Sequence, residues 1–197
     1  MLLWFAGCSL VLVWVVFRDP AIDYRLVIAG ALAPDVVDGI APGPLYLHTL
    51  AFGVAALAVV MLVTRGRRGL RRRLLALPIG VFLHLVLDAM WVRTAVFWWP
   101  AFGVAPGGDG LPSLSRPAAV VVIEELAGAA ALLWWWGRFR LSEPERRRRF
   151  VRTGRLSRDL AGEGPGRSRS SFSVLAPGPG RRAPWRPGAG GLVRDPR

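Results

Sequence analysis

The chain has 197 residues, of which 53% are hydrophobic and 20% charged, and all of its 26 basic residues are arginine. Its mean hydropathy of +0.38 is too high for an ordinary soluble domain or a disordered chain. The net charge of +13 is unevenly placed, because residues 1–137 hold ten Arg and eight acidic residues whereas residues 138–197 hold sixteen Arg and five. These numbers predict a nearly neutral apolar body followed by a basic tail.

Five apolar segments predict an all-α bundle of about five transmembrane helices. A membrane-spanning helix needs about 20 predominantly apolar residues. The first segment is interpreted as a retained helix and not as a signal peptide, because no basic residue precedes it. The second reaches spanning length only if it carries Asp35 and Asp38 in its outer half. The predicted spans cover residues 2–17, 26–40, 45–63, 74–92 and 118–137.

The arginines between these segments predict their orientation. Cytoplasmic loops of membrane proteins carry an excess of basic residues. The six Arg of residues 65–73 and the sixteen Arg after residue 137 therefore favour a cytoplasmic location for both segments. Each predicted span moves the chain to the other side of the membrane. The N-terminus, residues 34–48 and residues 93–116 are therefore predicted to lie on the outer side. The sequence thus predicts a multi-pass protein of the cytoplasmic membrane with an external N-terminus and a cytoplasmic C-terminal tail.

Composition divides the chain into a transmembrane helical domain, residues 1–140, and a disordered tail, residues 141–197. The tail is dominated by Arg, Gly, Pro and Ser and has too little apolar surface to offset its ordering entropy. Its run from Arg146 to Arg149 is predicted to lie next to the inner leaflet, where anionic phospholipid headgroups attract basic residues. Membrane lipid is therefore the expected partner. No motif indicates a specific nucleic-acid partner.

Both histidines of the chain lie near carboxylates within apolar sequence. His84 and Asp88 are four residues apart, and Asp35 and Asp38 three apart, so that each pair shares one face if its segment is helical. Ionisable groups in hydrocarbon are costly and indicate a functional site. The predicted topology brings these residues and His48 to the outer half of the bundle. Imidazole and carboxylate suit Zn²⁺, Mn²⁺ or Fe²⁺. Two alternatives stay open, namely a carboxylate that only fixes an imidazole tautomer and a histidine that only bonds a backbone carbonyl.

Four motifs occur in order within residues 20–105, namely PDVVD at 34–38, HT at 48–49, GVFLHLVLD at 80–88 and FWWPAFG at 97–103. This ordered set resembles a family of bacterial membrane-bound, predicted metal-dependent hydrolases. The resemblance implies a polytopic helical protein. Many members of that family carry an Arg and a further His just before the His-Ser or His-Thr step, where this chain has residues 43–47. The metal ligands that the resemblance implies are Asp35, Asp38, His48, His84 and Asp88.

Two hypotheses of function follow. The first is a metal-dependent hydrolase of the cytoplasmic membrane that acts on an ester or phosphoester of a lipid or envelope precursor, with zinc or manganese as the expected ion. A divalent ion can activate water near neutral pH, and Asp38 or Asp88 is the expected catalytic carboxylate that takes the proton. The second hypothesis is non-enzymatic, either a metal-binding membrane scaffold or a small permease.

Glu124 and Glu125 are a further pair of acidic residues within the last predicted span. Neighbouring side chains point about 100° apart on a helix, so the two cannot face one site equally. One of them is a candidate ligand or general base. The other is expected to meet Arg116, water or the bundle interior.

Overall fold

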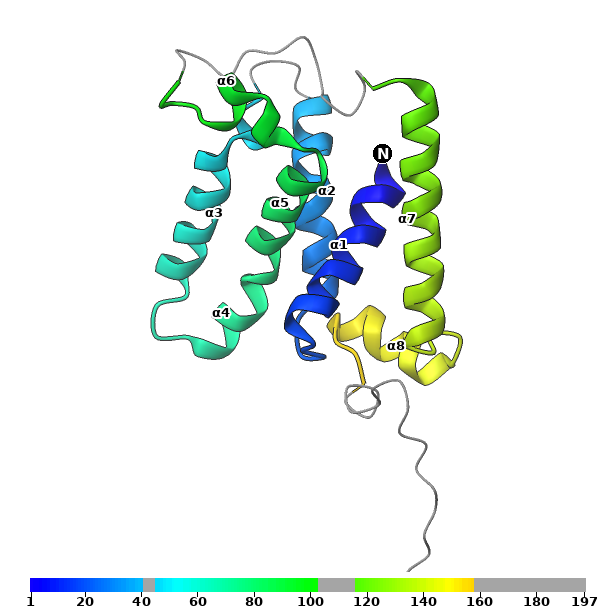
Figure 1. Cartoon of the computed structure of the whole chain (residues 1–197). Helices are drawn as coiled ribbons and strands as arrows, with labels where there is room; N and C mark the ends of the chain where they lie inside the picture. Colours follow the sequence, from blue (N-terminus) through cyan, green and yellow to red (C-terminus); the bar gives the residue numbers. More distant parts are fainter. Residues whose placement is uncertain (41–44, 103–115, 158–197) are drawn as a thin grey trace, which may run out of the picture. The chain divides into compact units, whose positions relative to one another are not determined.

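A computed structural model describes residues 1–40, 45–102 and 116–157, and these residues form helices and turns without any strand (Figure 1). The predicted all-helical class is thus confirmed for the described residues, which all belong to one unit spanning Met1–Gly164. The longer elements are α1 Leu2–Phe17, α2 Tyr24–Ile40, α3 Leu50–Val63, α5 Ala76–Leu87 and α7 Ala118–Arg138. The shorter elements are η1 Tyr46–His48, α4 Arg68–Leu74, η2 Met90–Val92, α6 Thr94–Phe97 and α8 Pro144–Thr153.

Two helix pairs that approach closely at glycines form the body. α1 packs against α7 where Gly7 meets Gly128, and a Cβ added to either glycine would overlap the backbone of the opposite helix. α2 packs against α5 in the same way at Gly30 and Gly80. Small residues at a crossing let two helix backbones come close, which is the usual way that helices associate within membranes.

A cluster of aromatic rings joins α1, α2 and α7 near the end of the body where α1 ends. The ring centroids of Trp14 and Phe139 lie 4.8 Å apart, those of Tyr24 and Trp135 4.8 Å apart, and those of Trp135 and Phe139 4.4 Å apart. All four side chains are buried. Aromatic pairs at such distances stabilise a core by about 0.5–1.5 kcal/mol each beyond the burial of their area.

Large apolar side chains face outward along α3 and α7. Leu62 of α3 is 67% exposed and Leu133 of α7 is 74% exposed, and extended apolar surface of this kind is unfavourable in water. Among the described helices, α7 alone is both long and apolar enough to cross a membrane, with 21 residues and a hydropathy of 1.7. The helices α1 and α3 are apolar but shorter, with 16 and 14 residues. The described residues therefore show one candidate span, and the five predicted crossings stay a prediction.

Two predicted helices have shorter bounds in the structure than in the sequence. The segment predicted at 45–63 begins with the turn η1, and the α-helix starts only at Leu50, because the Thr49 hydroxyl caps it by accepting from the Phe52 N–H at 3.0 Å. The segment predicted at 74–92 ends its α-helix at Leu87, since Ala89 adopts a left-handed backbone with φ 53°. α1 has the predicted bounds, and α7 ends one residue beyond its predicted end.

The predicted boundary between body and tail at residue 140 requires a correction. Residues 141–157 are ordered, and α8 packs on the body instead of belonging to a disordered tail. Leu141 and Leu156 are buried in the main core, and Phe150 packs against it. Three apolar side chains among arginines are too few to show a helical periodicity in the sequence. Each of them nevertheless packs into a core that is built mainly by other helices. Residues 158–197 lie outside the described residues.

Candidate metal centre

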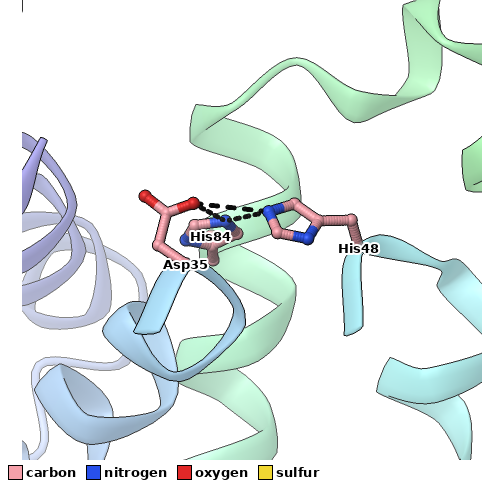
Figure 2. Close-up of side chains that lie close together, drawn as sticks. All are labelled: Asp35, His48 and His84. Atoms are coloured by element: carbon pink, nitrogen blue, oxygen red, sulfur yellow. Dashed lines mark hydrogen bonds and ion pairs between the residues drawn. The ribbon is translucent and has the colours of Figure 1, made fainter. Parts of the chain in front are cut away.

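Asp35, His48 and His84 converge from three separate elements, α2, η1 and α5 (Figure 2). The Nε2 atom of His48 lies 3.2 Å from Nε2 of His84 and 3.4 Å from Oδ1 of Asp35. The third side of this triangle, from His84 Nε2 to Asp35 Oδ1, measures 3.7 Å. Both imidazoles are fully buried, and the Asp35 side chain is 11% exposed.

The second nitrogen of each imidazole is held by an acceptor on the far side of the ring. His84 Nδ1–H donates to the carbonyl oxygen of Ala31 at 2.7 Å, and His48 Nδ1–H donates to the carboxylate of Asp38 at 2.7 Å. A carbonyl oxygen only accepts, so the Nδ1 atom of His84 carries the hydrogen and its neutral ring has a free lone pair on Nε2. His48 has the same arrangement when its hydrogen is on Nδ1, facing the Asp38 carboxylate. Contacts of this kind fix the tautomer of metal-binding histidines.

With a hydrogen on each Nδ1 and none on either Nε2, three acceptor atoms face one another in a buried space. Without a proton or a cation between them, the two Nε2 lone pairs and the Asp35 oxygen would repel one another. Tetrahedral zinc, at about 2.0–2.1 Å from each nitrogen, separates its ligand atoms by roughly 3.3 Å. The three measured separations of 3.2, 3.4 and 3.7 Å are close to that value. The donor set of two imidazoles and one carboxylate also suits a divalent ion of this class, so these residues could hold a metal ion.

Local sequence features explain the positions of the two histidines. Pro34 lies inside α2, where it lacks an N–H and crowds the preceding turn of the helix. The Ala31 carbonyl in that turn accepts from His84, and contacts from neighbouring helices commonly satisfy backbone groups near such prolines. His48 is held by the turn η1, which Thr49 stabilises by donating its hydroxyl to the Tyr46 carbonyl at 2.7 Å.

Asp88 does not join the three converging residues, contrary to the predicted ligand set. It ends α5, and its Oδ1 forms an ion pair with Arg116 Nη2 at 2.6 Å. The same guanidinium contacts the Asp88 carbonyl at 3.1 Å and Glu124 at 2.6 Å. A buried carboxylate is stabilised by the nearest cation, and here that cation is an arginine 28 residues further along the chain.

Asp38 also differs from its predicted role as a ligand. It contacts Nδ1 of His48, which is the ring nitrogen opposite the one that faces Asp35 and His84. Of the five predicted ligands, three therefore lie together, whereas Asp38 lies behind His48 and Asp88 pairs with Arg116. A carboxylate in this position holds the orientation and tautomer of the imidazole, here that of His48.

The two glutamates of α7 have separate partners. Glu124 pairs with Arg116, as expected for one of them, and Glu125 accepts from the Leu3 N–H at 3.2 Å. Neither is a member of the group of three.

Phe5 of α1 is a part of the site that the sequence does not reveal. Its buried ring lies against His84, with 4.2 Å between the ring centroids and 31° between the planes. Phe5 is one of many apolar residues in its helix, so no sequence signal distinguishes it.

The fold and the site define a class of helical protein with a buried cluster of two histidines and one aspartate that could hold a metal ion. Comparison of the chain with protein-family models, with curated proteins and with solved structures finds no match.

Proposed function

We propose that the protein is a metal-dependent hydrolase embedded in the cytoplasmic membrane. The observation that carries this proposal is the convergence of His48 Nε2, His84 Nε2 and Asp35 Oδ1 while both Nδ1 atoms are engaged elsewhere. Three protein ligands with a further position open are typical of catalytic zinc sites, whereas structural sites have four. When bound, the ion would supply Lewis acidity and activate water for attack on an ester or phosphoester. The resemblance of the ordered motifs to a hydrolase family supports the same reaction class.

The two predicted catalytic carboxylates differ in their hydrogen bonds. The Oδ2 atom of Asp38 accepts from the Nδ1–H of His48, which makes Asp38 a positioning residue for that imidazole. Asp88 has a buried Oδ2 with no hydrogen-bond partner among the described residues, and it lies one helical turn after His84. Asp88 is therefore the better candidate to accept a proton from water, with Arg116 holding its other oxygen in place.

Five membrane crossings with an external N-terminus remain our proposal for the topology. The C-terminal ends of α2 and α5 and the N-terminal ends of α3 and α7 lie at one end of the body, and α4 and α8 lie at the other (Figure 1). The first group of helix ends carries or adjoins Asp35, His48, His84 and Arg116. These ends correspond to the segments predicted to be external and cytoplasmic, respectively. This correspondence supports a metal centre near the outer surface of the membrane.

A lipid or an apolar envelope precursor is the proposed substrate class. An apolar groove of about 400 Å³ begins two residues after His48 and runs between α3 and Trp98 and Trp99. The Trp99 ring contacts Tyr46 of η1 with 5.3 Å between centroids, which links the groove to the turn that holds His48. An acyl chain in this groove would bring the polar end of its lipid toward the metal centre. The residues lining the groove are Leu50, Ala51, Val54, Ala55, Trp98 and Trp99.

A metal-stabilised scaffold is the second candidate, and the burial of the centre favours it. The imidazoles of His48 and His84 have no exposed surface, and closed sites are typical of structural metal ions. In such a protein the ion would tie α2, η1 and α5 together without turnover.

Elemental analysis of the detergent-purified protein tests metal binding for both candidates. We expect a stoichiometric divalent ion in the wild type and its loss in His84→Ala and Asp35→Ala. Glu145→Gln, at an exposed position on α8, is the control and should keep the ion. Turnover of chromogenic phosphodiesters or esters that disappears with His84→Ala supports the hydrolase. Metal-dependent thermal stability without turnover supports the scaffold, and a wild type that binds no ion excludes both.

A further inference from the structure

α8 is fixed to the body by contacts at its C-terminal end. The N–H of Tyr24 donates to the Gly154 carbonyl at 2.9 Å, and the N–H of Leu156 donates to the Pro20 carbonyl at 2.9 Å. Arg25 donates to the Val151 carbonyl at 2.6 Å. Gly154 has φ 69°, and a Cβ there would overlap the carboxylate of Asp23. The helix therefore has a defined position against the loop between α1 and α2.

Four of the five arginines of α8 are exposed. Arg147, Arg148, Arg149 and Arg152 are all exposed, whereas Phe150 packs toward the core. A hollow of about 1220 Å³ is lined by five arginines of this helix together with Glu145, Val151, Thr153 and Ser157. Two of these arginines have acidic partners, since Arg146 pairs with Glu143 and Arg148 pairs with Glu145 at 3.3 Å. The second pair is largely exposed and therefore contributes little. Five arginines and two glutamates leave α8 with a net positive charge.

A second basic segment is attached to the same loop. Arg72 of α4 binds Asp19 at 2.6 Å, and Arg73 binds Asp23 at 3.0 Å. These contacts place the exposed arginines of residues 65–73 at the same end of the body as α8 (Figure 1). Positive charge thus comes from two helices held by one loop.

The position of α8 relative to α7 indicates what this surface meets. α7, the candidate span, ends at Arg138, and α8 begins six residues later at Pro144. Trp134 and Trp136 are exposed in the last turns of α7, where aromatic residues commonly mark the level of lipid headgroups. If α7 crosses the membrane, the arginines of α8 lie at the headgroup region.

We infer that the arginine-lined hollow of α8 binds the headgroups of anionic phospholipids in the inner leaflet. The phosphate groups would pair with the exposed guanidinium groups, which match phosphate with several donors each. This surface lies at the end opposite the metal centre, so the inference does not depend on hydrolase activity.

The test uses the full chain in phosphatidylcholine nanodiscs that contain dansyl-phosphatidylglycerol as the probe. Energy transfer from the tryptophans near α8 reports the bound probe, and unlabelled phosphatidylglycerol competes for it. We expect Arg147→Gln/Arg148→Gln/Arg149→Gln to weaken binding of the probe roughly 10- to 100-fold. Removal of the same number of charges by Arg167→Gln/Arg169→Gln/Arg181→Gln, outside the described residues, should leave it unchanged. The corresponding triple Lys variant should keep most of the affinity, because it retains the charges.

Several results would overturn the inference. An equal loss in the two Gln variants would mean that net charge alone attracts the lipid. Equal competition by phosphatidylcholine would exclude an anionic site, and displacement of the probe by an RNA oligonucleotide at lower concentration than by phosphatidylglycerol would indicate a nucleic-acid surface instead. Thermal melting of each variant checks that it is folded, and a triple Lys variant that melts as the wild type does but fails to bind would also contradict the inference.

Discussion

The buried ring of Phe5 lies 4.2 Å from the imidazole of His84, measured between centroids. This contact makes α1 one wall of the candidate metal centre, although α1 supplies no ligand. The imidazole of His84 is thereby held from two sides, by the Phe5 ring and by the Ala31 carbonyl that accepts from its Nδ1–H. The packing of Phe5 in the core and the orientation of the His84 imidazole are consequently linked.

Replacing Phe5 with Ala should destabilise the protein by about 3–5 kcal/mol, because it leaves a cavity beside His84. It should also weaken metal binding, since the imidazole loses one of its supports. Thermal melting in detergent with and without added zinc measures both effects. Phe17→Ala in the same helix is the control, because Phe17 is 51% exposed. Equal losses from the two variants would contradict a special role for Phe5.

Asp38→Asn and Asp88→Asn should differ in their effect on metal affinity. Loss of the carboxylate that holds a metal-binding histidine typically weakens binding about 10- to 100-fold, so we expect this from Asp38→Asn. Asp88→Asn should leave the affinity nearly unchanged, because Asp88 pairs with Arg116. Competition with a chromogenic zinc chelator measures both affinities. A large loss in Asp88→Asn would show that Asp88 is a ligand, as the motif resemblance implies.

Gly128→Ala should destabilise the packing of α1 on α7. Its Cβ would overlap the backbone of Leu3, and such overpacking costs about 1–3 kcal/mol. Gly137→Ala, also in α7, is a matched control because nothing lies within 4 Å of its added Cβ. Alanine favours a helix over glycine by about 1 kcal/mol, so this control should be neutral or stabilising. Denaturation in mixed micelles compares the two, and equal melting temperatures would argue against the close crossing.

Asp23→Asn should reduce stability at neutral pH and change its pH dependence. Burial alone would raise the pKa of the Asp23 carboxyl, but hydrogen bonds and charge from Arg25 and Arg73 hold that pKa below its usual value. A lowered folded-state pKa contributes stability above the unfolded pKa, near 4, and this contribution is lost as the pH falls through the folded value. The wild type should therefore melt earlier as the pH drops below about 4.

The Asp23→Asn variant should lose part of that dependence and start from a stability lower by about 1–3 kcal/mol at pH 7. Melting temperatures recorded from pH 7 to 3 test this. Glu145→Gln, whose parent side chain is 87% exposed, should follow the wild-type curve. Parallel curves for the wild type and Asp23→Asn would refute the proposed contribution of this carboxylate.

The sequence was informative where a single physical effect dominates. Apolar runs ending at charged residues predict α1 and α7 closely, because hydrophobic length alone sets those bounds. The rarity of buried imidazole likewise predicts that His48 and His84 belong to one site, and they contact each other. Each of these inferences needed no knowledge of how distant segments pack.

Partner choice could not be predicted in the same way. Asp88 had two possible partners, the histidines and Arg116, and local spacing favours the histidine four residues away. In the structure Asp88 pairs with Arg116 instead. This pairing depends on where the chain places the start of α7, which local spacing does not reveal. The docking of α8 was equally hidden, since Phe150 and Leu156 gain burial from a core built by other helices.

The length of α2 relates the two ends of the molecule. Asp23 precedes this helix and binds Arg73, and Asp35 lies twelve residues later, roughly 18 Å along the axis at 1.5 Å per residue. Between them, Gly30 fits against the backbone of α5, the helix that carries His84. A slide of α2 by one turn, about 5.4 Å, would separate Asp35 from His84 and withdraw Asp23 from Arg73 together. The arginine contact at one end and the candidate metal cluster at the other therefore depend on the same position of α2 along its axis.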